Sequence, residues 1–162
     1  MKFNPFKITD KIPHEGVRNR VLDSLLAVGI PFNIGVGLQI KEINPCRVEV
    51  KSPPRFFRRN HVGGAHACAL ALMGEYAAGL LVAQKFPLSD YRMIIGKLEI
   101  DYHKQGRGSL KAYSEAPLEW PEISEEGSWI PMVTKIENSD GELVAECKTN
   151  WQVKAWSNVR KK

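Results

Sequence analysis

The sequence lacks two features that are typical of secreted proteins. It contains only three cysteines, Cys46, Cys68 and Cys147, and an odd number argues against a disulfide framework. The first residues, Met1 to Phe6, lead directly into polar sequence without the apolar core of a signal peptide. We therefore expect reduced thiols and a cytoplasmic protein.

Internal repeats and internal linkers are also missing from the sequence. Its 162 residues suffice for one domain with a sizeable core, and 43% hydrophobic and 25% charged residues are ordinary for a globular protein. We predict a single domain over residues 1–162. Its core is expected at about 17–156, with a short N-terminal extension and a basic C-terminal tail.

Acidic residues are too few to balance the basic ones. The formal net charge is +5 and the sequence pI is about 9.2. Such an excess favours anionic partners, whether nucleic acid, acidic lipid or a small molecule that carries phosphate. Part of the excess lies in the tail Arg160-Lys161-Lys162, which we interpret as a solvated end, so charge alone does not choose the partner.

Long hydrophobic runs are scarce, and the longest extends from Ala67 to Val82 with only Glu75 and Tyr76 as interruptions. A membrane span needs about 20 strongly apolar residues. This run is shorter, rich in Ala and Gly, and carries an acid near its middle that would cost roughly 2.5–3.5 kcal/mol in a bilayer. We predict a buried helix of a soluble protein and no membrane span.

The remaining segments predict one more helix and six strands. The helix covers residues 17–30, and its apolar face is expected to contain Val17, Val21, Leu25 and Val28, with Leu22 and Leu26 beside them. Alternating apolar and polar residues predict strands at about 36–41, 46–51, 98–102, 110–112, 130–137 and 143–155. Antiparallel strands need one covered face, and the central helix is the only large apolar element available. The predicted fold is α+β, with one curved antiparallel sheet around one long helix.

Polar and small residues set the central helix apart from simple packing. Asn60, His66 and Glu75 surround an otherwise apolar element, and the pair Gly63-Gly64 can turn the chain so that the first amides of the helix meet a ligand. One helical stripe carries almost no side chains and invites a close neighbour: Ala67, Ala71, Gly74 and Ala78. From the helix alone, a capped packing helix and a functional helix are equally good interpretations.

With Asn60, His66 and Glu75 spaced six and nine residues apart, the chain resembles the hotdog-fold proteins, in particular the phenylacetyl-CoA-type acyl-CoA thioesterases. The order of helices and strands is similar from about Val17 to Trp156, and Asp140 to Ala145 is typical of the last hairpin of that family. The sequence departs from the family where two glycines normally follow the histidine, since Ala67-Cys68 stands there instead. The resemblance implies a hotdog fold, a homodimer or dimer of dimers, and hydrolysis of a fatty or aryl acyl-CoA.

The resemblance also assigns expected roles to residues. Glu75 is expected to act as general base or nucleophile, and the amides around Gly64 to His66 to polarise the carbonyl. Asn60 would orient water or the carbonyl, and His66 would either donate a hydrogen bond or only cap the helix. The substrate is expected to contact Gly63 and Ala65, and the phosphates of coenzyme A to meet four cations: Arg58, Arg59, Lys104 and Arg107. No cofactor is expected apart from coenzyme A as part of the substrate.

Other functions are weighed against this one. A non-catalytic hotdog protein that binds acyl-CoA or lipid is favoured if Glu75 forms a structural salt bridge, and a 3-hydroxyacyl dehydratase would use His61 with Glu75. A metal site at His61, His66 and Cys68 lacks a fourth ligand, so no metal is predicted. The stretch Arg55 to Arg59 mixes arginine with phenylalanine as nucleic-acid binders do, but no recognised module surrounds it, so no nucleic acid is expected as a partner.

Overall fold

The computed structural model describes residues 5–159, so the predicted tail Arg160–Lys162 lies outside the described residues. The α-helices are α1 (Pro5–Thr9), α2 (Glu15–Gly29) and α3 (Ala67–Lys85). Single turns of 3-10 helix form η1 (Pro31–Ile34), η2 (Phe56–Arg58) and η3 (Trp156–Asn158). The strands are β1 (Gln39–Ile43), β2 (Arg47–Ser52), β3 (Tyr91–Tyr102), β4 (Leu110–Glu115), β5 (Ser128–Glu137) and β6 (Leu143–Ala155).

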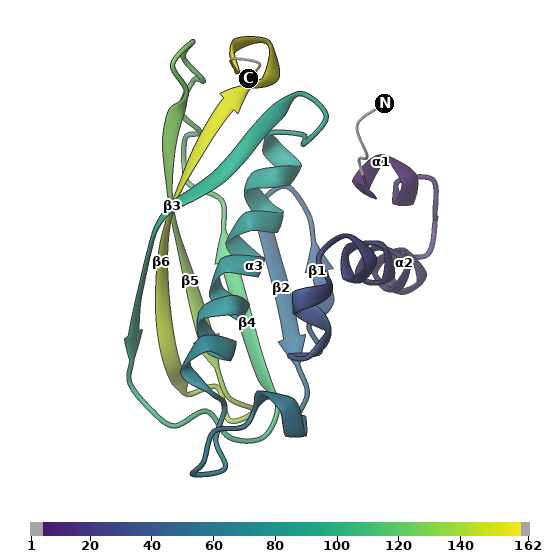
Figure 1. Cartoon of the computed structure of the whole chain (residues 1–162). Helices are drawn as coiled ribbons and strands as arrows, with labels where there is room; N and C mark the ends of the chain where they lie inside the picture. Colours follow the sequence, from purple (N-terminus) through teal and green to yellow (C-terminus); the bar gives the residue numbers. More distant parts are fainter. Residues whose placement is uncertain (1–4, 160–162) are drawn as a thin grey trace.

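The six strands form one antiparallel sheet in the order β1-β2-β4-β5-β6-β3. The sheet curves behind α3, which lies along its concave face (Figure 1). Successive side chains of β6 alternate between the two faces of the sheet, and those that face α3 are buried. The buried side chains include Cys147, Thr149, Trp151 and Val153. The predicted curved sheet around one helix is confirmed.

The small residues of α3 let the chain's own sheet come close. A Cβ added at Gly74 would lie 2.4 Å from Cβ of Cys147, and the Gly74 carbonyl accepts a hydrogen bond of 3.0 Å from Thr134 Oγ1. Ala78 is fully buried as well. The predicted small stripe is therefore divided, because Gly74 faces β5 and β6 and Ala78 is buried, while Ala67 and Ala71 remain partly accessible.

Helix α2 lies against β1 through a different face from the one predicted. Leu22 and Leu26 are buried, whereas Val17 and Val28 are 52% and 84% exposed. The buried Asn19 also faces inward, and its Nδ2 donates to the Lys41 carbonyl. Polar anchors to β1, which periodicity cannot reveal, set the rotation of this helix.

Within residues 5–159, strand β3 is an edge strand that pairs with β6 alone. It begins seven residues earlier than the predicted segment at 98–102. Its register with β6 places Leu98, Ile100 and Tyr102 on the α3 side of the sheet, yet Leu98 and Tyr102 are 38% and 49% exposed. An apolar edge of this kind is a template for pairing with another chain.

Candidate functional site

The segment before α3 and the turn between β3 and β4 form one hydrogen-bonded unit. The Ala65 N–H donates to the Gly106 carbonyl at 2.7 Å, and the His66 N–H donates to the Arg58 carbonyl at 2.7 Å. Gly64 lies so close to Gln105 that an added Cβ would be 2.6 Å from its Cγ. The start of the central helix is thus held by a loop (residues 58–66) and a turn (residues 103–108) that are far apart in sequence.

Asn60 shapes this loop. Its Oδ1 accepts hydrogen bonds from the amides of Val62 (3.2 Å) and Gly64 (3.0 Å), and its Nδ2 donates to the Ala65 carbonyl at 3.4 Å. Gly63 supports the same turn with a φ of +79°, a conformation that suits glycine. The side chain predicted to orient water or the carbonyl is engaged with backbone in this structure.

The hydrogen bonds of the loop engage the amides that were predicted to polarise the carbonyl. The amides of Gly64, Ala65 and His66 all have acceptors within the loop and turn. The amide that follows, Ala67 N–H, has no hydrogen bond within residues 5–159, and Ala67 is exposed at the first position of α3. Because the helix dipole favours negative charge at this end, Ala67 N–H is the best-placed donor for a carbonyl oxygen.

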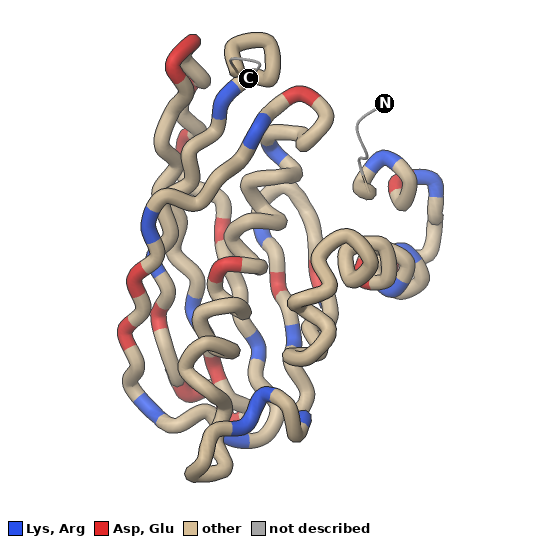
Figure 2. The backbone as a smooth tube through the Cα atoms, in the orientation of Figure 1, with Lys and Arg blue, Asp and Glu red and all other residues tan. Residues whose placement is uncertain are grey.

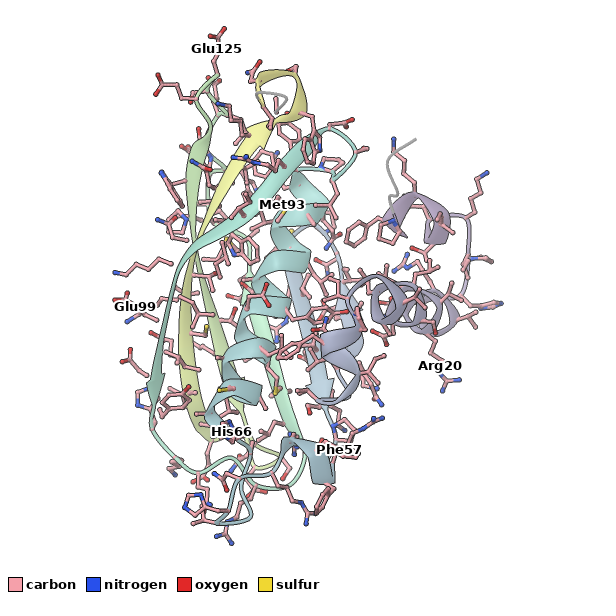
Figure 3. All side chains as sticks on the ribbon, viewed as in Figure 1. Arg20, Phe57, His66, Met93, Glu99 and Glu125 are labelled. Carbon is pink, nitrogen blue, oxygen red and sulfur yellow. The ribbon has the colours of Figure 1, made fainter. Side chains whose placement is uncertain are left out.

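His66 caps the helix. It is exposed near the start of α3 (Figure 3), and its Nδ1 accepts a hydrogen bond of 3.1 Å from the Cys68 amide. An accepting Nδ1 leaves the proton of the neutral ring on Nε2. Of the two roles left open by the sequence, the geometry supports the cap, and His66 holds the helix turn that presents Ala67 N–H.

Glu75 lies in the middle of α3 without a partner among the described residues. It is half-buried, and it forms neither a hydrogen bond nor an ion pair with any residue in 5–159. Burial raises the pKa of its carboxyl group. The same carboxylate adds to the effect of burial in raising the pKa of the Cys147 thiol to about 11.

Two steps of four residues lead from the free amide at Ala67 to Glu75, with a rotation of about 80° around the helix axis. Ala67 is exposed, and Ala71 and Glu75 are half-buried on successive turns of α3. We call these three residues the open stripe. Figure 2 shows that α3 carries a single acidic position, midway along the helix.

Tyr102 is a site residue that the sequence prediction missed. Its hydroxyl donates to the Ala67 carbonyl at 3.1 Å and so connects the edge strand β3 with the first turn of α3. Burial raises the pKa of this phenol, with smaller contributions from Cys68 and Cys147. The alternation of β3 indicated its face, but the contact with α3 depends on tertiary structure.

The four predicted phosphate ligands differ in availability. Arg58 is only 3% exposed, donates to Ser52 Oγ at 3.2 Å and to the Gly108 carbonyl, and has a pKa lowered by burial. The structure therefore corrects its assignment, since it is a buried connector between β2 and the turn. Lys104 is exposed and paired with Glu142 at 2.5 Å, and Arg107 Nε donates to Gln105 Oε1 at 2.9 Å. Arg59 is exposed and has no acidic partner in the described chain.

The dehydratase pair of His61 with Glu75 and a metal site have little geometric support. His61 is exposed in the loop before α3, while Glu75 lies about 12 Å beyond the helix start at 1.5 Å per residue, so one chain does not bring them together. Within residues 5–159, no group of three or more His, Cys, Asp or Glu side chains is arranged to hold a metal ion. Helix α3 is long and apolar enough to span a membrane by composition, but most of it is buried by the sheet.

Comparisons with solved structures identify the fold. A protein of unknown function from Pseudomonas aeruginosa, described as a probable thioesterase, is 22% identical, with 81% of this chain and 91% of that chain covered at a TM-score of 0.73. A single-residue variant of a thioesterase enzyme from Staphylococcus aureus is 16% identical, with 76% and 98% covered at a TM-score of 0.68. A hypothetical thioesterase protein from Streptococcus pneumoniae is 20% identical, with 74% and 91% covered at a TM-score of 0.61. At these identities the likeness shows the fold alone, which is the hotdog fold.

The sequence itself matches a family model over most of its length. No curated protein matches the chain. The model of a domain of unknown function, DUF4442, matches residues 18–153, which contain α3 and all six strands except the last two residues of β6. The chain therefore belongs to the DUF4442 family, within a fold shared with thioesterase-superfamily proteins.

Proposed function

We propose that this protein is an acyl-CoA thioesterase whose base is Glu75. The observation that carries the proposal is a half-buried carboxylate and an N-terminal amide of the same helix that are both unpaired within residues 5–159. A carboxylate that served packing alone would need a partner or would be replaced by an apolar residue, because burial without compensation is costly. The thioesterase neighbours of similar fold support the same reaction class.

The chemistry follows from these two groups. Glu75 takes a proton from a water molecule whose oxygen attacks the thioester carbonyl carbon, and Ala67 N–H donates to the oxyanion that forms. Collapse of the tetrahedral intermediate breaks the carbon–sulfur bond, and the protonated Glu75 returns its proton to the leaving thiolate. A pKa raised by burial makes Glu75 a stronger base than an exposed glutamate. Direct attack by the carboxylate remains the second route.

Both groups must come from different copies of the chain to serve one thioester. Within one helix, Ala67 and Glu75 are separated by about 12 Å along the axis, which exceeds the reach from a base through one water to a carbonyl and its donor. Two antiparallel α3 helices that cross at Ala71 would place Glu75 of each copy opposite Ala67 of the other. The unpaired edge of β3 and the small side chain of Ala71 suit such a homodimer.

The non-catalytic alternative rested on a structural salt bridge at Glu75, and none exists within residues 5–159. The dehydratase alternative needs His61 beside Glu75, which would again require two chains. We also expect the protein in the reducing cytoplasm, where its three free cysteines, two of them exposed, would stay reduced.

The test is a hydrolysis screen over short, long and aryl acyl-CoA thioesters, read by release of the free thiol. We expect turnover of at least one class and loss of that turnover in Glu75→Gln. Glu126→Gln, which removes an exposed acid from the loop before β5, is the matched control. Absence of hydrolysis across the screen by a folded wild-type protein would reject the thioesterase assignment.

A further inference from the structure

The single turn η2 inverts the usual distribution of polar and apolar side chains. Arg58 is 3% exposed, whereas its neighbours Phe56 and Phe57 are 80% and 83% exposed. A buried arginine and a pair of exposed phenylalanines are each uncommon in a soluble protein. Here both occur within three consecutive residues, so the backbone of η2 is set to direct the charge inward and the rings outward.

The inward arginine makes this arrangement rigid. Its guanidinium donates to Ser52 Oγ at the end of β2 and to the Gly108 carbonyl in the turn before β4. The Arg59 N–H donates to the Phe56 carbonyl at 3.0 Å, which closes the turn. The two rings lie edge to face, with centroids 5.7 Å apart, and Figure 3 shows Phe57 at the end of the molecule, away from the core. The phenylalanines are presented by a fixed turn.

The two chain segments that meet around the rings are basic, and the one acid that borders the small cavity beside Arg55 is Asp23 of α2. No Asp or Glu occurs between Val50 and Gly74, or between Tyr102 and Ser114, the two segments that meet at this end. Arg55 and Arg59 flank the rings, are exposed, and have no acidic partner in the described chain. Figure 2 shows the blue positions gathered around η2 and the start of α3.

Further exposed apolar side chains lie nearby. Phe32 and Ile34 of η1 are 76% and 56% exposed. Ile34 borders the same small cavity as Arg55, so η1 and η2 adjoin. Both lie beside β1 and β2, at the opposite side of the sheet from the β3 edge.

We propose that Phe56 and Phe57, with Arg55 and Arg59, bind the surface of an anionic lipid bilayer. Aromatic rings that enter the interface and flanking cations that meet acidic headgroups are the two contributions on which peripheral membrane binding depends. A second copy of the chain could bury the exposed rings. It would, however, bring unpaired arginines of two chains together, each chain with a net charge of +5, and like charges repel. The observed charge therefore favours lipid as the occupant.

The experiment is co-sedimentation of the full chain with vesicles of neutral phosphatidylcholine and with vesicles containing phosphatidylglycerol. We expect binding to the anionic vesicles only, weakening as salt rises because exposed charges are screened. F56S with F57S should lower the partition coefficient about tenfold or more, and R55A with R59A should remove the preference for anionic lipid. Matched controls are Leu118→Ser, a fully exposed apolar residue elsewhere, and Lys135→Ala on β5; both should bind as wild type.

Light scattering and an oligonucleotide assay complete the test. If the wild type binds no anionic vesicle, or if the double phenylalanine variant binds as well as wild type, the proposal is overturned. A change of mass in the phenylalanine variant, without vesicle binding by wild type, would instead assign the surface to a contact between copies. Binding to single-stranded oligonucleotide without vesicle binding would assign it to nucleic acid.

Discussion

The two sides of α3 differ in how completely the fold satisfies them. On the side that faces β5 and β6, Gly74 is tightly packed against Cys147 and its carbonyl accepts a hydrogen bond from Thr134. On the open stripe, the Ala67 amide and the Glu75 carboxylate have no partners within residues 5–159. The packed residues of the helix therefore account for the fold, and the accessible ones retain the polar groups that the proposed hydrolysis needs.

The largest expected effect belongs to Glu75. Glu75→Gln keeps the shape of the side chain and removes the base, so turnover of the best acyl-CoA should fall by about 10²-fold or more. The measurement is thiol release under saturating substrate. Unchanged turnover in a folded variant would falsify the base assignment and make the two sides of α3 equivalent in function.

Stability separates a lost base from a damaged fold. Because the folded-state pKa of Glu75 is raised, its charged form destabilises the protein above that pKa, and this cost disappears as pH falls to the unfolded value. Glu75→Gln should therefore raise the Tm at pH 7 more than at pH 4. A lower Tm at both pH values would indicate that the variant lost structure and not chemistry.

The second effect concerns the open stripe as a contact between chains. Ala71→Arg introduces a long cation where two helices would cross, so light scattering should report half the wild-type mass and turnover should fall about tenfold or more, because each copy loses its partner's amide. Ser24→Arg, on the exposed side of α2, is the control. A wild-type mass for Ala71→Arg would contradict the crossing at Ala71.

The third effect belongs to the packed side. Gly74→Ala places a Cβ 2.4 Å from Cβ of Cys147, and overpacking of this kind costs about 1–3 kcal/mol of unfolding free energy. Gly79→Ala is the matched comparison, since its nearest contact is the edge of the Trp151 ring at 3.0 Å and helix propensity gains up to about 1 kcal/mol. Denaturant titration should show a clear loss for the first variant and little change for the second; equal losses would contradict the closer approach of β6 at Gly74 than at Gly79.

Elements governed by periodicity could be predicted from the sequence. Strand β6 occupies the predicted residues 143–155, and α3 begins at the predicted Ala67 because an apolar run and a capping histidine are local signals. The short helix α1 and the first seven residues of β3 were missed, since neither has a clean alternation. Contacts with β1 set the rotation of α2, and so its apolar face was predicted wrongly.

The candidate site, like the fold, could be predicted from the sequence only in part. Glu75 stood out because it is an acid in an apolar helix, and that signal needs no tertiary information. Which amide remains free depends on the hydrogen bonds of the loop, so the predicted donors Gly64 to His66 gave way to Ala67. Likewise, nothing in the sequence distinguishes Arg58 from Arg59, although one is buried and the other exposed.

The smallest expected effect concerns Asp23, a second half-buried acid that, unlike Glu75, has been given partners. Its carboxylate accepts hydrogen bonds of 3.0 and 3.2 Å from the Ile40 amide, yet burial still raises its pKa to about 6, against the lowering by that bond and by Lys41. A carboxyl group with a raised folded-state pKa is most favourable below its unfolded value near 3.8, and its contribution to stability is lost as pH rises through about 6. Asp23→Asn keeps an acceptor for Ile40 and removes the charge, so its Tm should exceed that of wild type at pH 8 and approach it at pH 4. For Asp10→Asn, which removes an exposed acid, the difference in Tm from wild type should be the same at pH 8 and pH 4. A Tm for Asp23→Asn below that of wild type at pH 8 would mean that the hydrogen bonds to the charged carboxylate stabilise the fold by more than its burial costs. The charged form would then stabilise the protein at the partnered Asp23 and destabilise it at the unpartnered Glu75.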